Sequence, residues 1–188
     1  MSGVGVSVAQ QTFQFAGNGA IPITPHQLRI KEISAQKACR YNQLWHSRLP
    51  IIKVGNVLRN RYAVCYGFFY NQICYAVGIW SSPVNQNFPI DSTIELRRYA
   101  IRDVAPKNTA SWGLGLMVKL IKKKFGKIKL FISYQDTSVH KGTIYRAAGW
   151  VAKNKTKFAD WSHKSRKRNK VQSNAEKIRW EFEGGAKK

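Results

Sequence analysis

Four side chains that can move a proton or attack a substrate stand at positions suited to that chemistry. His46 follows an aromatic helix end and precedes a proline turn, and Asp136 ends an apolar run that is typical of a buried strand. Ser111 stands where a helix should begin, and Tyr145 lies in a short helical stretch. A histidine can act as a general base near neutral pH. We therefore take His46, Asp136, Ser111 and Tyr145 as the candidate catalytic residues.

Each of these residues also has a structural interpretation, which the sequence leaves open. His46 could bond the last carbonyl groups of its helix, and Asp136 could cap a turn. Ser111 could belong to the capping turn of its helix, and Tyr145 could be a core aromatic residue. His46, Asp136 and His140 have the composition of a two-histidine, one-carboxylate iron site. They are far apart in the sequence, so the pattern predicts no metal site.

The elements that must position these side chains form one unit between residues 94 and 150. The apolar pattern predicts a strand over 93–101, a polar loop over 103–110, a helix over 111–125, a strand over 128–134, a short helix over 143–148 and a strand from 150. A chain that passes from one strand to a parallel neighbour through a helix leaves a cleft where the strands end, and ligands bind there. We predict the functional site in this cleft.

The strand over 93–101 carries two adjacent arginines, and alternation predicts that they point to opposite faces. One face should hold Glu95, Arg97 and Tyr99, and the other Leu96, Arg98 and Ala100. A buried arginine needs a carboxylate or a phosphate partner. One of the two arginines should therefore point into the covered face, where it would bind a ligand or, in the case of Arg98, form an ion pair to Glu95 or Asp136.

The segments outside this unit predict a helix and a hairpin before it and a strand after it. A short strand is expected near 28–30, a helix from the N-cap Ser34 to His46, and a hairpin over 61–70 and 73–80. Loop 81–89 is long and polar enough to face a substrate, and residues 177–182 alternate like an edge strand. The buried stripe of helix 111–125 is expected at Trp112, Leu116, Leu120 and Ile121.

The overall charge points to a polyanionic partner. The 188 residues include 32 Lys and Arg against 9 Asp and Glu, which leaves a formal net charge of +23. Such an excess costs self-repulsion, and nucleic acid is the partner class that usually offsets it. A solvated basic tail is the alternative. The residues that we assign to DNA binding, among which Phe158 and Trp161 are interleaved, are Lys153, Lys155, Lys157, Lys164, Arg166, Lys167 and Arg168.

The length predicts one domain over residues 21–188, preceded by an arm of residues 1–20. No apolar run approaches the ~20 residues of a membrane-spanning helix, and the N-terminus does not look like a secretory signal. We expect no membrane partner. Cys39, Cys65 and Cys74 show no paired spacing, which is typical of thiols in a reducing compartment and does not indicate a zinc site.

The order of the elements resembles that of the GNAT acyltransferases. The resemblance implies an α/β (α+β) fold, in which a central mixed sheet is flanked by helices. In that family the loop before the long helix offers N–H groups to a coenzyme pyrophosphate and carries (Q/R)-x-x-G-x-(G/A). Here loop 103–111 has no glycine, and Gly113 and Gly115 come only inside the helix. A loop without glycine approaches phosphate less closely, so acetyl-CoA is a candidate donor whose motif is missing.

Five short motifs in a fixed order resemble the Mom proteins of bacteriophages, which are GNAT-like, modify adenine in DNA and protect phage genomes from restriction. The motifs are W-H-S-R-L-P at 45–50, E-L-R-R-Y at 95–99, K-N-T-A-S-W at 107–112, S-Y-Q-D at 133–136 and H-K-G-T-I-Y-R-A-A-G-W at 140–150. The resemblance implies transfer of a carbamoylmethyl (glycinamide-type) group to adenine N6. It also implies substrate or donor contacts for Arg98, Asn108 and Trp112.

The resemblance further implies an acyl or glycyl donor of unknown identity, links iron to the chemistry, and suggests the cytoplasm of an infected host cell as the location. Double-stranded DNA is the expected partner. Because adenine N6 is paired and stacked in a duplex, the base would have to be flipped into the site.

Two other functions share part of the pattern. A GNAT N-acetyltransferase that uses acetyl-CoA on a protein or a small amine would have the same fold, although the loop without glycine argues against it. A non-catalytic basic DNA-binding protein would have the same charge. The sequence does not define an oligomeric state.

Overall fold

The computed structural model describes residues 21–46, 51–156 and 176–184. Seven strands form one sheet in the order β1-β2-β3-β4-β5-β7-β6. The strands are β1 (Arg29–Glu32), β2 (Val64–Tyr70), β3 (Ile73–Ser81), β4 (Thr93–Ile101), β5 (Leu130–Asp136), β6 (Val151–Thr156) and β7 (Lys177–Glu183). The helices are the 3-10 helix η1 (Pro25–Gln27), α2 (Ala35–Trp45), α3 (Val54–Leu58), α4 (Thr109–Lys124) and α5 (Thr143–Ala147). The predicted mixed sheet flanked by helices is confirmed. The predicted arm 1–20 lies outside the described residues.

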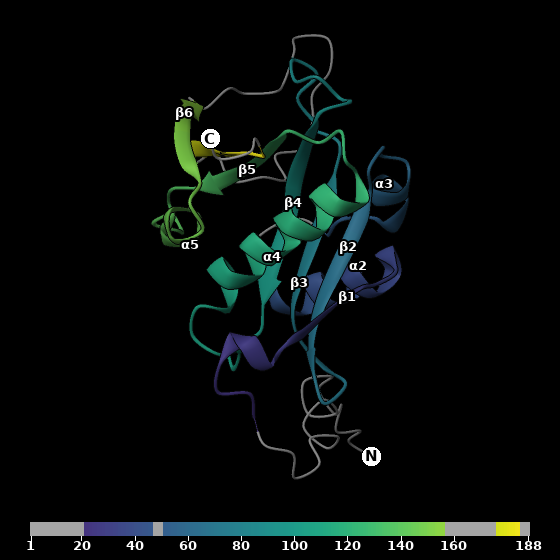
Figure 1. Ribbon diagram of the computed structural model, residues 1–188, viewed down its shortest axis with the longest axis vertical. Helices are drawn as coiled ribbons and strands as arrows, with labels where there is room; N and C mark the ends of the chain where they lie inside the picture. Colours follow the sequence, from purple (N-terminus) through teal and green to yellow (C-terminus); the bar gives the residue numbers. More distant parts are fainter. Residues whose placement is uncertain (1–20, 47–50, 157–175, 185–188) are drawn as a thin grey trace, which may run out of the picture.

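Helices lie on both faces of the sheet. α4 crosses the front of β2, β3 and β4, and α2 lies behind the same strands (Figure 1). The larger part of the core lies on the α4 side and includes Trp80 and Phe131. The smaller part lies on the α2 side, where Ala38 packs with Val77 and Ile79. The central strands β2, β3 and β4 contribute side chains to both parts of the core, so they present apolar residues to both sides, as buried strands do.

Local sequence accounts for the boundaries of the first helix and the first hairpin. The Ser34 hydroxyl accepts a hydrogen bond from the Lys37 N–H at 3.3 Å, which caps α2 as predicted. Asn71 and Gln72 both have positive φ angles, 45° and 66°. Two such residues between antiparallel strands match the right-handed twist of a tight hairpin. The hairpin is therefore confirmed, with its first strand beginning at Val64 rather than at residue 61.

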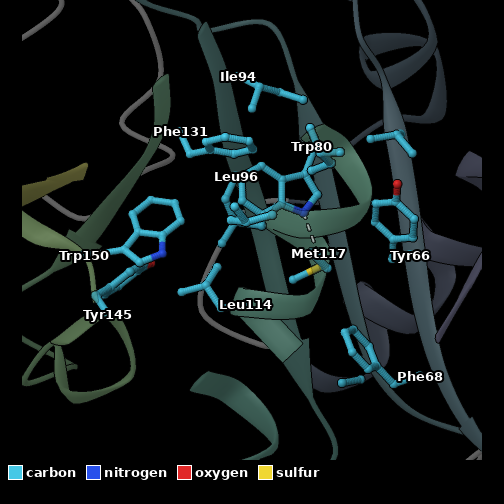
Figure 2. Close-up of a cluster of buried hydrophobic side chains, with 14 of the residues drawn as sticks. Tyr66, Phe68, Trp80, Ile94, Leu96, Leu114, Met117, Phe131, Tyr145 and Trp150 are labelled. Atoms are coloured by element: carbon cyan, nitrogen blue, oxygen red, sulfur yellow. Dashed lines mark hydrogen bonds between the residues drawn. The ribbon is translucent and has the colours of Figure 1, made fainter. Parts of the chain in front are cut away.

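The buried face of α4 differs from the predicted stripe. It consists of Leu114, Met117, Val118 and Ile121, whereas Leu116 and Leu120 are only partly buried. The helix packs closely on the sheet at Gly78, where a Cβ atom would overlap the Met117 sulfur. There the Trp80 indole N–H donates to Met117 Sδ at 3.2 Å, which Figure 2 shows at the centre of the aromatic cluster.

The last strand is not at the edge that its sequence pattern suggested. β7 lies between β5 and β6 and pairs antiparallel with both, so β6 is the edge strand. The burial of Trp180, which stacks on Tyr145 with ring centroids 5.2 Å apart, favours this insertion. α3 was not predicted at all, because five residues are too few to show a helical period.

No helix among the described residues is long and apolar enough to cross a membrane. The three cysteines are buried and unpaired. Burial raises the pKa of Cys65 to about 12 and that of Cys74 to about 11, so neither thiol is a nucleophile at neutral pH.

Candidate active site

The parallel strands β4 and β5 separate in the middle of the sheet. They pair only from Thr93 with Leu130 to Leu96 with Ser133, although both strands continue beyond these residues. Figure 1 shows β5 turning away from β4 after this point. Past Leu96 and Ser133, the facing backbone groups of the two strands no longer bond each other. This is where the sequence predicted the functional site.

A bulge in β4 reverses the predicted orientation of Arg98. Arg98 pairs with Ile79 and Leu96 with Trp80, so Arg97 is an extra residue without a partner on β3. Ile79 belongs to the core on the α2 side and Trp80 to the core on the α4 side. Arg98 therefore lies on the α2 side together with Glu95, and the predicted grouping of Arg98 with Leu96 is wrong.

Arg98 is a partly buried cation that makes no ion pair within the described residues, although the Glu95 carboxylate lies within electrostatic reach. Its Nη1 donates to the carbonyl oxygen of Arg97 at 2.7 Å, and its Nε is buried with no acceptor. Burial lowers the pKa of Arg98, and the adjacent Arg97 lowers it further. The predicted alternative of an ion pair to Glu95 is not found, because Glu95 pairs with Arg97 at 3.4 Å. A group with lone pairs or negative charge would complete the surroundings of Arg98.

His46 ends α2 beside this arginine. Its backbone N–H donates to the Asn42 carbonyl oxygen at 2.8 Å, and its side chain is half buried. Burial lowers the pKa of His46, and the interactions with the Arg98 guanidinium and the His140 imidazole lower it further. His46 is therefore neutral at pH 7, with a ring nitrogen able to accept a proton. The structure brings His46, Arg98 and His140 together, although they come from three distant parts of the chain.

Asp136 forms the turn that returns His140 to this group. Its Oδ1 accepts hydrogen bonds from the Ser138 N–H at 2.9 Å and from the Ser138 hydroxyl at 2.5 Å. Its carbonyl oxygen accepts from the His140 N–H at 3.1 Å. Within the described residues, no three His, Cys, Asp or Glu side chains gather closely enough to hold a metal ion, so His46, Asp136 and His140 do not form an iron site here.

The two other candidate catalytic residues lie on the opposite side of the sheet. Tyr145 is buried, and its hydroxyl shares a 2.8 Å hydrogen bond with Ser133 Oγ. Burial raises the pKa of Tyr145. Ser111 lies in the first turn of α4, where its hydroxyl donates to the Asn108 carbonyl oxygen at 3.3 Å. Their catalytic assignment stays a prediction, and His46 belongs to a different part of the site.

The N-terminus of α4 offers free backbone donors beside Ser111. Asn108 caps the helix in the left-handed conformation, with φ 65°, and its side chain makes no capping bond. The N–H groups of Ala110 and Ser111 find no acceptor among the described residues. Such groups bind phosphate well, so this terminus fits a coenzyme pyrophosphate even without glycines. Trp112 packs edge-on against Phe68 at 6.0 Å next to this terminus.

Loop 82–92 is fastened over the sheet by polar side chains that the sequence reasoning did not assign. The Glu95 carboxylate, which is 6% exposed, accepts from the Val84 N–H at 2.9 Å. Tyr134 bonds Asn85, and the guanidinium of Arg179 lies 5.0 Å from the centre of the Phe88 ring. The only feature of the sequence that could have indicated these contacts was a charged residue in otherwise apolar strands. These contacts fix the loop beside the point where β4 and β5 separate.

Only two of the residues assigned to DNA binding can be placed. Lys153 and Lys155 are exposed on the edge strand β6, and Lys155 pairs with Glu176 at 3.7 Å. The remaining assigned residues lie outside the described part of the chain: Lys157, Lys164, Arg166, Lys167 and Arg168. Their role stays a prediction.

Replacing Arg98 by glutamine will raise the pKa of His46 toward its ordinary value of about 6.5, because a positive charge that lowers it is removed. The titration of the His46 ring by ¹H–¹³C NMR measures this shift. In the wild type, the folded protein binds this proton less readily than the unfolded chain. The stability from neutral His46 is therefore present above about pH 6.5 and is lost as the pH falls through the folded pKa.

The matched control for this titration is Arg29→Gln, which removes the same charge from the exposed edge strand β1. It should leave the His46 titration unchanged. An equal effect of both substitutions, or no effect of either, would contradict the placement of Arg98 beside His46.

Solved structures of acetyltransferases resemble this one. A Bacillus subtilis acetyltransferase in complex with CoA has a TM-score of 0.58 at 16% identity, and the match covers 83% of this chain and 98% of that one. The Escherichia coli ribosomal-protein-S18-alanine N-acetyltransferase has a TM-score of 0.60 at 10% identity, over 86% and 96% of the two chains. A GNAT family acetyltransferase from Elizabethkingia anophelis with acetyl-CoA bound has a TM-score of 0.55 at 15% identity, over 84% and 98%. At these identities the likeness establishes the fold, and the predicted GNAT-like fold is confirmed.

The sequence itself matches one family profile, that of the Mom protein family, over residues 27–185. No curated protein matches it significantly. The matched range contains β1 to β7 and all the candidate catalytic residues, and it confirms the resemblance carried by the five motifs. The chain belongs to the Mom protein family and has the GNAT acyltransferase fold.

Proposed function

We propose that this protein transfers a carbamoylmethyl group to the N6 atom of adenine in DNA. The observation that carries the proposal is the neutral His46 beside the unpaired Arg98, at the place where β4 and β5 separate, in a chain of the Mom family. A neutral base and a partly buried cation on one face suit a reaction in which an amine loses a proton.

The chemistry explains why both groups are needed. The adenine N6 lone pair is conjugated with the ring, so the amine is a poor nucleophile. As N6 bonds to the methylene carbon of the transferred group, the leaving group departs with its electron pair, and N6 gives one proton to His46. Negative charge develops on the leaving group during this transfer, and Arg98 would stabilise it.

The donor is proposed to bind at the N-terminus of α4, where the N–H groups of Ala110 and Ser111 would hold a pyrophosphate. Because this terminus and His46 lie on opposite sides of the sheet, the transferred group would reach N6 through the opening between β4 and β5. The residues present fit a coenzyme A type of donor, and two structural relatives are described with CoA or acetyl-CoA bound. In this step the leaving group must be on the methylene carbon that N6 attacks, because a thioester would instead transfer an acyl group through its carbonyl carbon. Asn108 and Trp112 flank this position and are proposed to contact the donor.

DNA is proposed as the substrate because of the formal charge of +23 and the exposed Lys153 and Lys155 on β6. The target base would leave the duplex to reach His46. The proposal includes a role in the infected host cell, where the modified adenine protects phage DNA from restriction.

Nucleoside mass spectrometry of DNA from bacteria that express the protein tests the proposal. We expect a deoxyadenosine in which one carbamoylmethyl group replaces an N6 hydrogen. Unmodified deoxyadenosine throughout would refute it. If the DNA is unmodified and an acetylated protein or small amine appears instead, the N-acetyltransferase alternative is supported. DNA binding without any modification would support the non-catalytic alternative.

A further inference from the structure

Asn42 is a second buried hydrogen-bond donor without an acceptor on the α2 face of the sheet. Its side chain is 4% exposed, and its Nδ2 has no partner among the described residues. An unpaired amide buried in an apolar layer costs free energy comparable to a lost hydrogen bond. Such a group needs an explanation, and the mechanism proposed above does not use it.

Helical spacing places Asn42 above Arg98. Cys39, Asn42 and His46 follow one another along the face of α2 that packs on the sheet. Cys39 and His46, on either side of Asn42, both lie within electrostatic reach of Arg98. Asn42 Nδ2 and Arg98 Nε are thus two buried donors, one on the helix and one on the bulged strand, on the same side of the sheet.

Burial along this face of α2 decreases toward the C-terminal end of the helix. Ala38, one turn before Asn42, is fully buried, whereas His46, one turn after it, is only half buried. A flat ligand that approached past His46 would reach Asn42 about one helical turn, or ~5.4 Å, deeper.

We propose that Asn42 and Arg98 form a pocket that receives a ring nitrogen of the acceptor adenine, and that Asn42 is a specificity-determining residue. This inference rests on the proposed function, because it assumes that adenine is the acceptor. Adenine carries lone pairs at N1, N3 and N7, and a base whose N6 faces His46 can direct one of them at the two donors. Asparagine is a residue that commonly reads adenine by hydrogen bonds.

Binding of base analogues tests the pocket without the donor. The probe is a short single-stranded oligo-dC with one central adenine, compared with the same strand carrying 1-, 3- or 7-deazaadenine, each of which lacks one ring nitrogen. Phosphate contacts are identical in all four strands and cancel in the ratio of affinities. We expect the wild type to bind one analogue about tenfold more weakly than adenine.

The substitution Asn42→Leu separates a ligand-binding amide from a structural one. It should abolish the discrimination between adenine and the analogue while the melting temperature stays the same or rises, because a buried donor without an acceptor is removed. If the amide had a structural role instead, the substitution would lower the melting temperature of the protein. The matched control is Gln36→Leu on the exposed face of the same helix, which should change neither quantity.

The inference is overturned if the wild type binds all four strands equally, a comparison that does not depend on any variant. It is also overturned if Asn42→Leu keeps the discrimination or lowers the melting temperature. Either result leaves the proposed function standing, since that function is judged by the modified nucleoside in cellular DNA. Conversely, the modified nucleoside could be absent while the wild type still binds one analogue tenfold more weakly than adenine. That result would refute the proposed reaction and support the adenine pocket.

Discussion

Replacing His46 by alanine will lower the modified deoxyadenosine in DNA from expressing cells by about 10²- to 10⁴-fold, the usual contribution of a general base. The expectation follows from the state of the ring. Burial and the charge of Arg98 lower the pKa of His46, so that its neutral form is present at the pH of the cell. No other neutral base among the candidate catalytic residues lies on the α2 face, because Tyr145 and Ser111 are on the other side of the sheet.

Two measurements separate a catalytic effect from a loss of structure or of binding. The His46→Ala protein should keep the DNA affinity and the melting temperature of the wild type within a small margin. Leu44→Ala, two residues away on the exposed side of α2, should modify DNA as the wild type does. Full modification of DNA by the His46→Ala protein would show that His46 is not the base, and Asp136 would then be the candidate.

Most of the fold could be predicted because its elements have strong local signals. The hydroxyl of Ser34 and the alternation over 93–101 mark boundaries that the structure reproduces, with β4 spanning Thr93–Ile101 as predicted. The place of β7 between β5 and β6 could not be predicted, since it depends on which edges remain open after the other strands have paired. Sequence order alone favours a strand at the edge.

The site was harder to predict than the fold because it depends on one inserted residue. Strict alternation put Arg98 on the side of Leu96, and the bulge at Arg97 moved it to the side of His46. A bulge has no reliable local pattern when the extra residue is not glycine. Asn42 was missed for a different reason: an asparagine among the small residues of an amphipathic helix looks like a polar position until its burial is known.

Replacing Gly113 by alanine will destabilise the protein by about 1–3 kcal/mol, whereas the same change at Gly115 will stabilise it by about 0.5–1 kcal/mol. Both glycines lie inside α4, where alanine is the better helix former. A Cβ at Gly113 would overlap the Tyr99 hydroxyl and come within 2.9 Å of the Phe68 ring. It would also disturb the 3.2 Å bond from the Tyr99 hydroxyl to the Thr109 carbonyl oxygen. A Cβ at Gly115 would meet nothing within 4 Å.

Urea unfolding of both variants measures the two free-energy changes, and their opposite signs make the pair its own control.

Gly113→Ala also tests the donor site, because Tyr99 bonds the first residue of α4 and a displaced helix would move the N–H groups of Ala110 and Ser111. We expect this variant to lose DNA modification beyond what its stability explains, while Gly115→Ala keeps it. Destabilisation of the same size at both positions would contradict the close approach of α4 to the sheet at Gly113. Unchanged modification in Gly113→Ala would contradict the placement of the donor at the start of this helix.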